Sequence, residues 1–174
     1  MRMRIFLIKS KEDCVCPVCR SPLCKRDKKK RVHKIQGGIK EWYIINRLKC
    51  TNVKCKKLHN ELPDFISPYK HYGAELIEDV VDEIITSDDL GTENYPCQDT
   101  MNHWKFWIAL NEDNINGQIK STAYSLFGLS TEFLKSKGSL LKELRKKISP
   151  GWLSVANRFI YNSGGRLDPK PEPV

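Results

Sequence analysis

The chain carries Cys16-Pro17-Val18-Cys19 and, after residues 20–49, Cys50-Thr51-Asn52-Val53-Lys54-Cys55. We call these two segments knuckle 1 and knuckle 2. Four thiolates satisfy the tetrahedral, sulfur-rich coordination of a structural Zn²⁺, and a short loop inside each pair lets backbone amides point at the sulfurs. The spacing predicts a zinc ribbon that holds one structural zinc ion through Cys16, Cys19, Cys50 and Cys55. Because the protein would fill all four positions, we expect the metal to fold the domain and not to catalyse a reaction.

Other residues could replace one of these ligands, namely Cys14, Cys24, His33 and His59. Cys14 would form an awkward chelate with Cys16, and Cys24 has no close partner in the sequence. A second zinc ion held by the remaining residues also stays open. Cys97 is interpreted as a small buried hydrophobic residue.

Charge is segregated along the 174 residues, which carry 30 Lys and Arg against 21 Asp and Glu for a net charge of +9. Residues 1–60 have a net charge of +14, residues 61–100 of −10 and residues 101–174 of +5. A strongly basic, metal-stabilised module is typical of a protein that binds a polyanion, because each neutralised phosphate releases condensed counterions. We therefore expect double-stranded DNA as the partner, with a solvated surface that binds nothing as the alternative.

The first apolar run of the chain, residues 5–8, bears on the cellular compartment. Residues 5–8 are apolar, but the charged residues 9–13 end this run before it reaches the length of a signal peptide, and no run approaches the length of a membrane span. We expect a cytoplasmic protein with reduced thiols and no membrane partner.

The sequence between the knuckles predicts a basic hairpin. Residues 25–31 are interpreted as a basic loop, and Gly37-Gly38 is interpreted as a two-residue turn between two strands. In the second strand Tyr43 lies on one face and is the candidate for stacking on bases, whereas Trp42 is assigned to the core. The candidate phosphate and base contacts of the hairpin are Lys25, Arg26, Lys28, Lys29, Lys30, Arg31, Tyr43, Arg47 and Lys49.

Helical periodicity replaces strand periodicity after residue 73. One helix has an apolar stripe through Leu76, Ile77, Val80, Val81, Ile84 and Ile85 and an acidic face formed by Glu75, Glu78, Asp79, Asp82 and Glu83. An acidic face repels phosphate, so we interpret this helix as a scaffold. A second helix over residues 96–110 buries Met101, Trp104, Trp107 and Ile108, and its outward side chains suit base edges and phosphates: Gln98, Asn102, His103 and Lys105.

Two further helices are predicted over residues 131–148 and from Ser149 as N-cap to a stop at Asn162-Ser163-Gly164-Gly165. The Pro-rich residues 168–174 are expected to be disordered. The sequence thus predicts an α+β fold, with a zinc ribbon of β-hairpins over 1–68 and a mainly α-helical, helix-turn-helix-like domain over 69–167.

Several short segments also match a family pattern: Cys16-Pro17-Val18-Cys19, Arg47-Leu48-Lys49-Cys50, Leu62-Pro63-Asp64-Phe65 and Pro68-Tyr69-Lys70-His71-Tyr72. Over about residues 14–110 the chain resembles an uncharacterised bacterial family with a transposase-like zinc ribbon. That family is similar to the N-terminal zinc ribbon plus helix-turn-helix of insertion-sequence transposases. The resemblance implies that the helices after the ribbon form the DNA-binding unit, with Thr100 and Trp104 in the position of a Thr-x-x-x-Trp recognition-helix pattern.

Such transposases continue into a ribonuclease-H-like core with three Mg²⁺-binding acids, and these 174 residues are too few to hold one as well. No nucleophile–base pair, phosphate-cradling loop or HExxH spacing is present either. We therefore expect a protein that is not an enzyme: a DNA-binding regulator or accessory factor of a mobile element or phage. The alternatives are an adaptor or inhibitor that binds a bacterial protein, and an RNA-binding protein.

Overall fold

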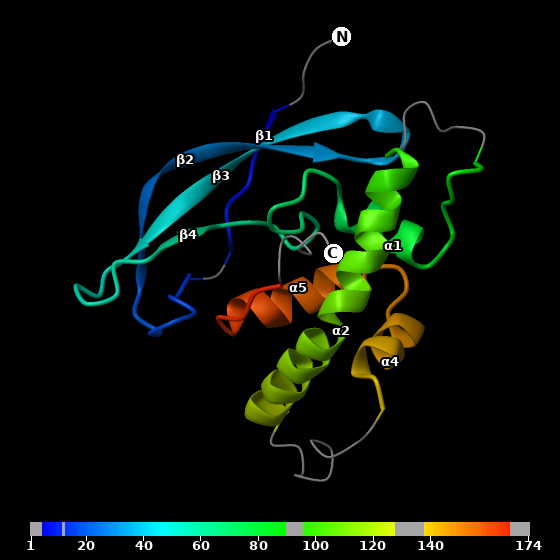
Figure 1. The fold of residues 1–174 in the computed structure, drawn as a ribbon. Helices are drawn as coiled ribbons and strands as arrows, with labels where there is room; N and C mark the ends of the chain where they lie inside the picture. The colour runs from blue at the N-terminus through cyan, green and yellow to red at the C-terminus, as the bar shows by residue number, and fades with distance from the viewer. Residues whose placement is uncertain (1–4, 12, 90–95, 128–137, 168–174) are drawn as a thin grey trace.

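A computed structural model describes residues 5–11, 13–89, 96–127 and 138–167 of the chain. It shows a mixed α+β fold in which N-terminal strands are followed by four helices in the described part of the chain. The strands lie together on one side of the molecule and the helices on the other (Figure 1). This confirms the predicted fold class at the level of strands followed by helices.

A long hairpin forms the sheet. Strand β2 (Leu23–Lys34) pairs antiparallel with β3 (Lys40–Cys50) from end to end, with one shift of register between Lys25 and Asp27. On the other edge of β3, the short strand β1 (Ile5–Leu7) pairs in parallel and β4 (Leu58–Asn60) pairs antiparallel. Strand β3 is therefore central and β2 lies at an edge of the sheet.

The predicted basic loop is wrong, because residues 25–31 belong to strand β2. Lys29 pairs with Ile45, Lys30 with Ile44 and Arg31 with Tyr43. The β-branched and aromatic residues of β3 favour a strand strongly, and pairing with them overrides the weak strand preference of lysine.

The hairpin turn is confirmed at Gly37 and Gly38, but it is longer than two residues. A 3-10 turn over Gln36–Gly38 is closed by a hydrogen bond of 3.0 Å from the Ile35 amide to the Ile39 carbonyl. Both glycines have positive φ, at 73° and 70°, a conformation that glycine adopts without steric cost.

The two faces of the hairpin have different surroundings. On the face that we call inner, His33 and Tyr43 pack against the ring of Phe65, with centroid distances of 5.2 and 5.5 Å. Arg31 lies on the same face and donates a hydrogen bond of 2.8 Å to the carbonyl of Lys70. The inner face therefore contacts residues 65–73, which lead into the helices.

The helices are α1 (Ala74–Val81), α2 (Gln98–Phe127), α4 (Leu140–Lys147) and α5 (Trp152–Asn162). The predicted buried stripe of α2 is confirmed, since Met101, Trp104, Trp107 and Ile108 are at most 3% exposed. They pack with α1, α4 and α5 in one core that includes Leu76, Ile77, Leu141, Trp152, Leu153 and Ile160. Helix α2 continues well beyond the predicted end at residue 110.

Helix α1 departs from its prediction in two ways. It ends at Val81, so Ile84 does not join the apolar stripe and is 64% exposed. Glu78 was expected on the acidic face but is only 2% exposed. Its carboxylate accepts hydrogen bonds from the amides of Gly151 (2.6 Å) and Leu153 (2.8 Å) at the start of α5. The carboxylate of Glu78 therefore caps α5.

Three further predictions meet the structure in different ways. Ser149 is not the N-cap of α5, because that helix begins at Trp152 after Gly151 with a φ of 117°. Residues 82–97 separate α1 from α2, far more than the three or four residues of a helix-turn-helix turn, so helix-turn-helix character is not confirmed.

The first part of the helix predicted over 131–148 lies outside the described residues, as does the tail 168–174. The proposed domain boundary at residue 68 stays a prediction.

The hairpin contacts the helical part at both of its ends. Near the turn, the Lys34 amide donates to the His71 carbonyl (2.8 Å) and the Gly73 amide donates to the Lys34 carbonyl (2.9 Å). Near the knuckles, Gly164 lies so close to Pro17 that a Cβ at Gly164 would be 2.8 Å from the Pro17 carbonyl oxygen. The knuckle end of the sheet therefore packs directly against the segment that follows α5.

Candidate metal centre

The four predicted cysteines converge at one end of the hairpin. Cys16 and Cys50 are buried, and Cys19 and Cys55 are half-buried. All four Sγ atoms lie within 4.8 Å of one another, with 3.4 Å between Cys19 and Cys50 and 3.8 Å between Cys16 and Cys55. A tetrahedral zinc with Zn–S bonds of ~2.3 Å has S–S edges of ~3.8 Å. The cluster therefore has the size that a tetrahedral metal ion requires.

Strand pairing brings the knuckles together. Leu23, which follows knuckle 1, pairs with Cys50, the first residue of knuckle 2. The Thr51 amide donates to the Pro22 carbonyl (3.1 Å), and knuckle 1 is closed by a bond from the Cys16 amide to the Ser21 carbonyl (2.8 Å). The β2–β3 register thus fixes the distance between the two cysteine pairs.

Both knuckles end in the same backbone conformation. Arg20 follows the second cysteine of knuckle 1 with a φ of 59°, and Lys56 follows that of knuckle 2 with a φ of 49°. The amide of Arg20 donates to the Cys16 carbonyl (2.8 Å), and that of Lys56 donates to the Asn52 carbonyl (3.0 Å). A left-handed conformation at a residue other than glycine costs about 1 kcal/mol or more. The only sequence signal for these positions is their place directly after a cysteine pair.

The pKa values of Cys19 and Cys50 are shifted in opposite directions. The hydroxyl and the amide of Ser21 lower the pKa of Cys19 to about 6. Burial raises the pKa of Cys50 to about 12. At neutral pH Cys19 therefore loses its proton without a metal, whereas a metal must displace the proton of Cys50. Because binding releases protons, the affinity of the site for a metal rises with pH.

None of the alternative ligands belongs to the cluster found among the described residues. His59 on β4 lies close to the cluster, with its Nε2 3.4 Å from the Sγ of Cys16. Cys24 is exposed, and its thiol donates to the Lys49 carbonyl. His33 lies on the inner face beside Glu41. The carbonyl of Cys14 accepts a hydrogen bond from Leu23.

Cys97 corrects a smaller prediction, because it is exposed and not buried. It immediately precedes α2, and its Sγ lies 3.3 Å from the hydroxyl of Thr100. Hydrogen bonds from the side chain and amide of Thr100 lower the pKa of Cys97. A cysteine at this position replaces the usual capping residue of a helix.

The basic candidates fall into two groups. Six are exposed on the hairpin strands: Lys25, Arg26, Lys28, Lys29, Lys30 and Lys49. Of these six, Arg26 lies 3.8 Å from the carboxylate of Asp27 and Lys30 lies over the ring of Trp42. The other two are half-buried, and Arg31 donates to the Lys70 carbonyl while Arg47 forms an ion pair with Asp27. The exposed group lies mainly on β2, the edge strand.

Tyr43, the predicted stacking residue, lies in an aromatic cluster on the inner face. Its ring centroid is 5.4 Å from that of Phe6 and also contacts His33 and Phe65. Its hydroxyl donates to Glu41 over 2.7 Å, and burial together with this contact raises the pKa of Tyr43 to about 12. The ring of the half-buried Tyr43 is therefore occupied by contacts with other rings of the protein.

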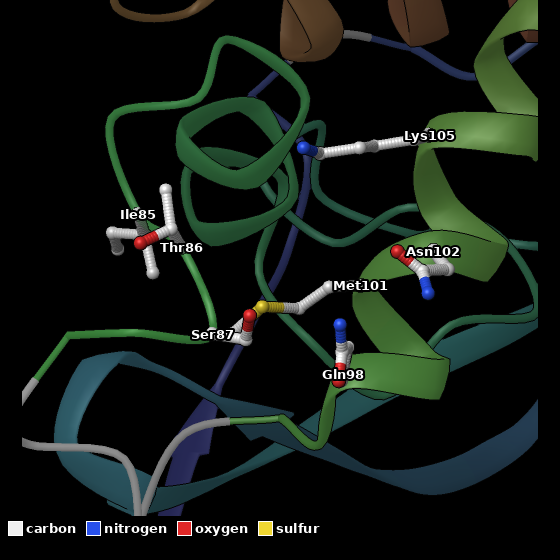
Figure 2. A pocket seen from close by; sticks show the side chains of 7 residues that line it. All are labelled: Ile85, Thr86, Ser87, Gln98, Met101, Asn102 and Lys105. Atoms are coloured by element: carbon white, nitrogen blue, oxygen red, sulfur yellow. The ribbon is translucent and has the colours of Figure 1, made fainter.

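The outward residues of α2 lie together near its first turns. Gln98, Asn102 and His103 are exposed, and Lys105 forms an ion pair of 3.0 Å with Glu83. Figure 2 shows Gln98, Asn102 and Lys105 around a small pocket of about 150 Å³, opposite Ile85, Thr86 and Ser87. Phe106, one turn further along, is 47% exposed. This face of α2 is therefore mixed in character and has no free concentration of positive charge among the described residues.

No helix in the described ranges is long and apolar enough to cross a membrane.

Comparison with known proteins gives one family. No curated protein matches the chain, and no solved structure does. The resemblance to transposases therefore stays a prediction. One family model, described as a domain of unknown function (DUF6431), matches residues 16–104. This range is more than half of the chain and contains all four cysteines, the hairpin and α1, so the chain belongs to the family described as a domain of unknown function, DUF6431.

Proposed function

We propose that the protein is a non-catalytic DNA-binding protein in which one structural Zn²⁺ holds a basic hairpin against the phosphates of duplex DNA. The observation that carries this proposal is the row of exposed cations on the edge strand β2: Lys25, Arg26, Lys28, Lys29 and Lys30. Exposed cations on a rigid strand supply sequence-independent phosphate contacts.

The neighbouring charges support phosphate binding. Asp27 is the only acid within β2, and Arg47 on the adjacent strand pairs with it. The guanidinium of Arg47 lowers the pKa of Asp27. The negative charge of Asp27 is thus balanced locally and leaves the positive field of the surrounding lysines largely intact.

Zinc is the proposed metal because the donors are four cysteine sulfurs at tetrahedral spacing. Cys50→Ser should abolish stoichiometric zinc binding and unfold the knuckle end of the hairpin. Cys24→Ser is the matched control, because Cys24 is an exposed thiol on the facing strand. Zinc content of the two purified variants checks this, and full zinc occupancy of Cys50→Ser would contradict the proposed ligand set.

Base recognition is assigned within this proposal to the exposed face of α2. The side-chain amides of Gln98 and Asn102 suit the donor and acceptor pattern of base edges in the major groove, and His103 lies beside them. A role as regulator or accessory factor of a mobile element rests on the resemblance to transposase ribbons alone. Replacing Asn102 and His103 together should remove sequence preference and leave non-specific binding.

The direct test is selection of random duplex DNA by the zinc-loaded protein, with affinity followed across salt concentration. Lys28→Gln/Lys29→Gln/Lys30→Gln should reduce the slope of log affinity against log salt by about three. The control removes the same charge from exposed lysines of α4: Lys142→Gln/Lys146→Gln/Lys147→Gln. Equal losses in the two triple variants would show that net charge alone drives binding, and would overturn the hairpin assignment.

A second candidate function is an adaptor that binds an acidic protein surface. It is favoured by two exposed apolar side chains at the knuckles, Val18 at 51% and Val53 at 76% exposure. Lys54 and Lys56 lie beside Val53. A protein complex that resists salt, together with weak DNA binding without sequence preference, would favour this candidate over the first.

A further inference from the structure

The face of the sheet opposite the inner face carries a partly exposed tryptophan. In the β2–β3 register Val32 is opposite Trp42 and Lys30 is opposite Ile44, and β1 places Ile5 beside Trp42. Residues opposite one another in a sheet project from the same face, and this face alternates with that of Tyr43. We call it the outer face. It includes Ile5, Leu7, Lys28, Lys30, Trp42 and Ile44, together with Val32 and the buried Asn46.

This outer face is open. Ile5 is 49% exposed and Leu7 is 60% exposed, and Trp42 and Ile44 are partly exposed. The ammonium of Lys30 lies over the indole of Trp42, 4.3 Å from the ring centroid. A flexible lysine over an indole is a weak cover, since an exposed cation–π contact contributes only about 0.5–1 kcal/mol.

The outer face carries the positive charges of Lys28 and Lys30 around Trp42. One carboxylate reaches this face beside Lys28, because Glu61 accepts a hydrogen bond from the side chain of Asn46, which is opposite Lys28. The two acids of the hairpin strands are Asp27 and Glu41. They lie opposite Arg47 and His33 in the register, which places both on the inner face. Lys28 and Lys30 are exposed on the outer face. The two lysines would repel a second copy of this surface by like charge, so the charge of this face favours an anionic ligand.

We infer that the outer face around Trp42 binds an unpaired base of the nucleic acid, with the base stacked on the indole and Lys28 and Lys30 on the flanking phosphates. This inference rests on the proposed function, nucleic-acid binding by the hairpin, and adds the kind of nucleic acid that this part of the hairpin takes. An aromatic ring between aliphatic side chains and lysines suits a ligand with a flat apolar base and a charged backbone. Entry of the base moves the Lys30 ammonium from the ring to a phosphate.

The structure reverses the roles that the sequence predicted for the neighbouring residues Tyr43 and Trp42. Tyr43 was the expected stacking residue, and its ring is packed between Phe6, His33 and Phe65. Trp42 was assigned to the core, and it lies on the open face. The alternation itself was predictable. Which face the helical part would cover was not.

Intrinsic fluorescence tests the inference without any substitution. The other tryptophans are buried, with Trp104 at 3%, Trp107 at 2% and Trp152 at 0% exposure. Oligothymidine of about 12 nucleotides should therefore quench Trp42 selectively, by stacking on its indole. A blunt duplex of the same length and salt concentration should leave the fluorescence nearly unchanged. Absence of quenching by the bound single strand would overturn the inference.

Two variants measure the contribution of the ring. Trp42→Leu should weaken oligothymidine binding by about 5- to 140-fold, the equivalent of one lost base stack, and leave duplex affinity about unchanged. Trp42→Phe keeps an aromatic face and should retain most of the single-strand affinity. Zinc content and melting temperature show whether each variant is folded. If Trp42→Leu does not fold, Trp42→Phe still tests the inference. It should bind oligothymidine but lose the fluorescence quenching that the unsubstituted protein shows.

The outcomes separate this inference from the proposed function. Duplex binding that depends on Lys28, Lys29 and Lys30, with no Trp42-dependent single-strand binding, overturns the inference and leaves the function. Trp42-dependent binding of oligothymidine without duplex binding overturns the duplex proposal and supports the inference. Quenching by neither oligonucleotide, with neither bound, overturns both and leaves the adaptor function.

Discussion

Lys56 shows how a single residue can carry strain at the metal centre. Its φ of 49° places it in the left-handed region, where a Cβ is unfavourable and glycine is not. Lys56→Gly should raise the stability of the zinc-loaded protein by about 1 kcal/mol. Thermal unfolding of the zinc-loaded protein measures this change.

Lys54→Gly is the matched control for that prediction. Lys54 lies in the same knuckle and is also an exposed lysine, but it is not among the residues with positive φ. The same change of charge and side chain should there be neutral or destabilising, by about 0.5–1 kcal/mol. Equal effects of the two substitutions would show that the lysine side chains, and not backbone strain, decide the stability of the loop.

At the residue scale, prediction from the sequence succeeded where the chemistry of a side chain leaves few alternatives. The four cysteines were identified from spacing alone, because two close cysteine pairs separated by a strand-forming segment are typical of a metal site. Glu78 was not identified, since a carboxylate in an acidic helix is ordinarily solvated. Its burial depends on the start of α5, which is more than seventy residues away in the sequence.

Helix α5 depends on a cap supplied by another helix. The Glu78 carboxylate of α1 accepts the amides of Gly151 and Leu153. Glu78→Gln replaces one acceptor oxygen by an amide NH₂ that faces a donor, so it should destabilise the fold by about 1–3 kcal/mol. Glu75→Gln, an isosteric change at an exposed position of the same helix, should change stability little. Urea unfolding of both variants measures the difference, and equal stabilities would refute the capping role.

The junction between the sheet and α1 depends on the absence of a side chain at Gly73. A Cβ there would lie 2.5 Å from the Nε2 of His33, and the ring of His33 is held by Phe65 and Tyr43. Gly73→Ala should therefore destabilise the protein by about 1–3 kcal/mol.

Gly117, within α2, gives the opposite expectation. A Cβ at this position meets nothing within 4 Å, and Gly117→Ala should stabilise the helix by about 0.5–1 kcal/mol. Melting temperatures of the two variants should therefore move in opposite directions. A stabilising Gly73→Ala would mean that His33 can leave its position easily.

Element types were more predictable than element ends. Strand β3 and the first turns of α2 have clear apolar periodicity, and both were predicted. The extension of α2 beyond residue 110 was missed because its sequence there is mostly polar, with Ile115 as the buried anchor. A strand was predicted directly before the turn, but the part of β2 over residues 25–31 was predicted as a loop, because its lysines have a low strand propensity and their conformation is imposed by β3.

The metal centre and the helical part are physically linked in the whole molecule. Gly164 contacts Pro17 of knuckle 1, and the guanidinium of Arg20 donates to the Asn162 carbonyl. Removal of the metal by a chelator should therefore loosen the end of α5 as well as the knuckles.

Hydrogen exchange tests this link at individual amides. The Gly165 amide, bonded to the Ile160 carbonyl, should exchange faster after chelation. The Leu141 amide, bonded to the side chain of Asn116 between α4 and α2, should keep its exchange rate. Uniform acceleration would indicate that the metal supports the entire fold, and no acceleration at Gly165 would indicate that the knuckle and α5 are independent.

The arrangement of the whole molecule was the least predictable level. The segregation of charge was visible in the sequence, but the docking of the hairpin at both ends was not. That docking depends on close approaches at single glycines, Gly73 and Gly164, which carry no signal of their partner.

The edge position of β2 has a consequence for the solubility of the protein. An unpaired edge of a long strand is a template onto which strands of other molecules can add, and this addition leads to aggregation. Lysines along such an edge oppose it by repulsion between copies. The cations of β2 therefore protect the free protein from self-association. A bound polyanion would neutralise these charges and would also cover the strand. Aggregation should therefore be strongest when the polyanion neutralises the lysines but leaves part of the edge uncovered.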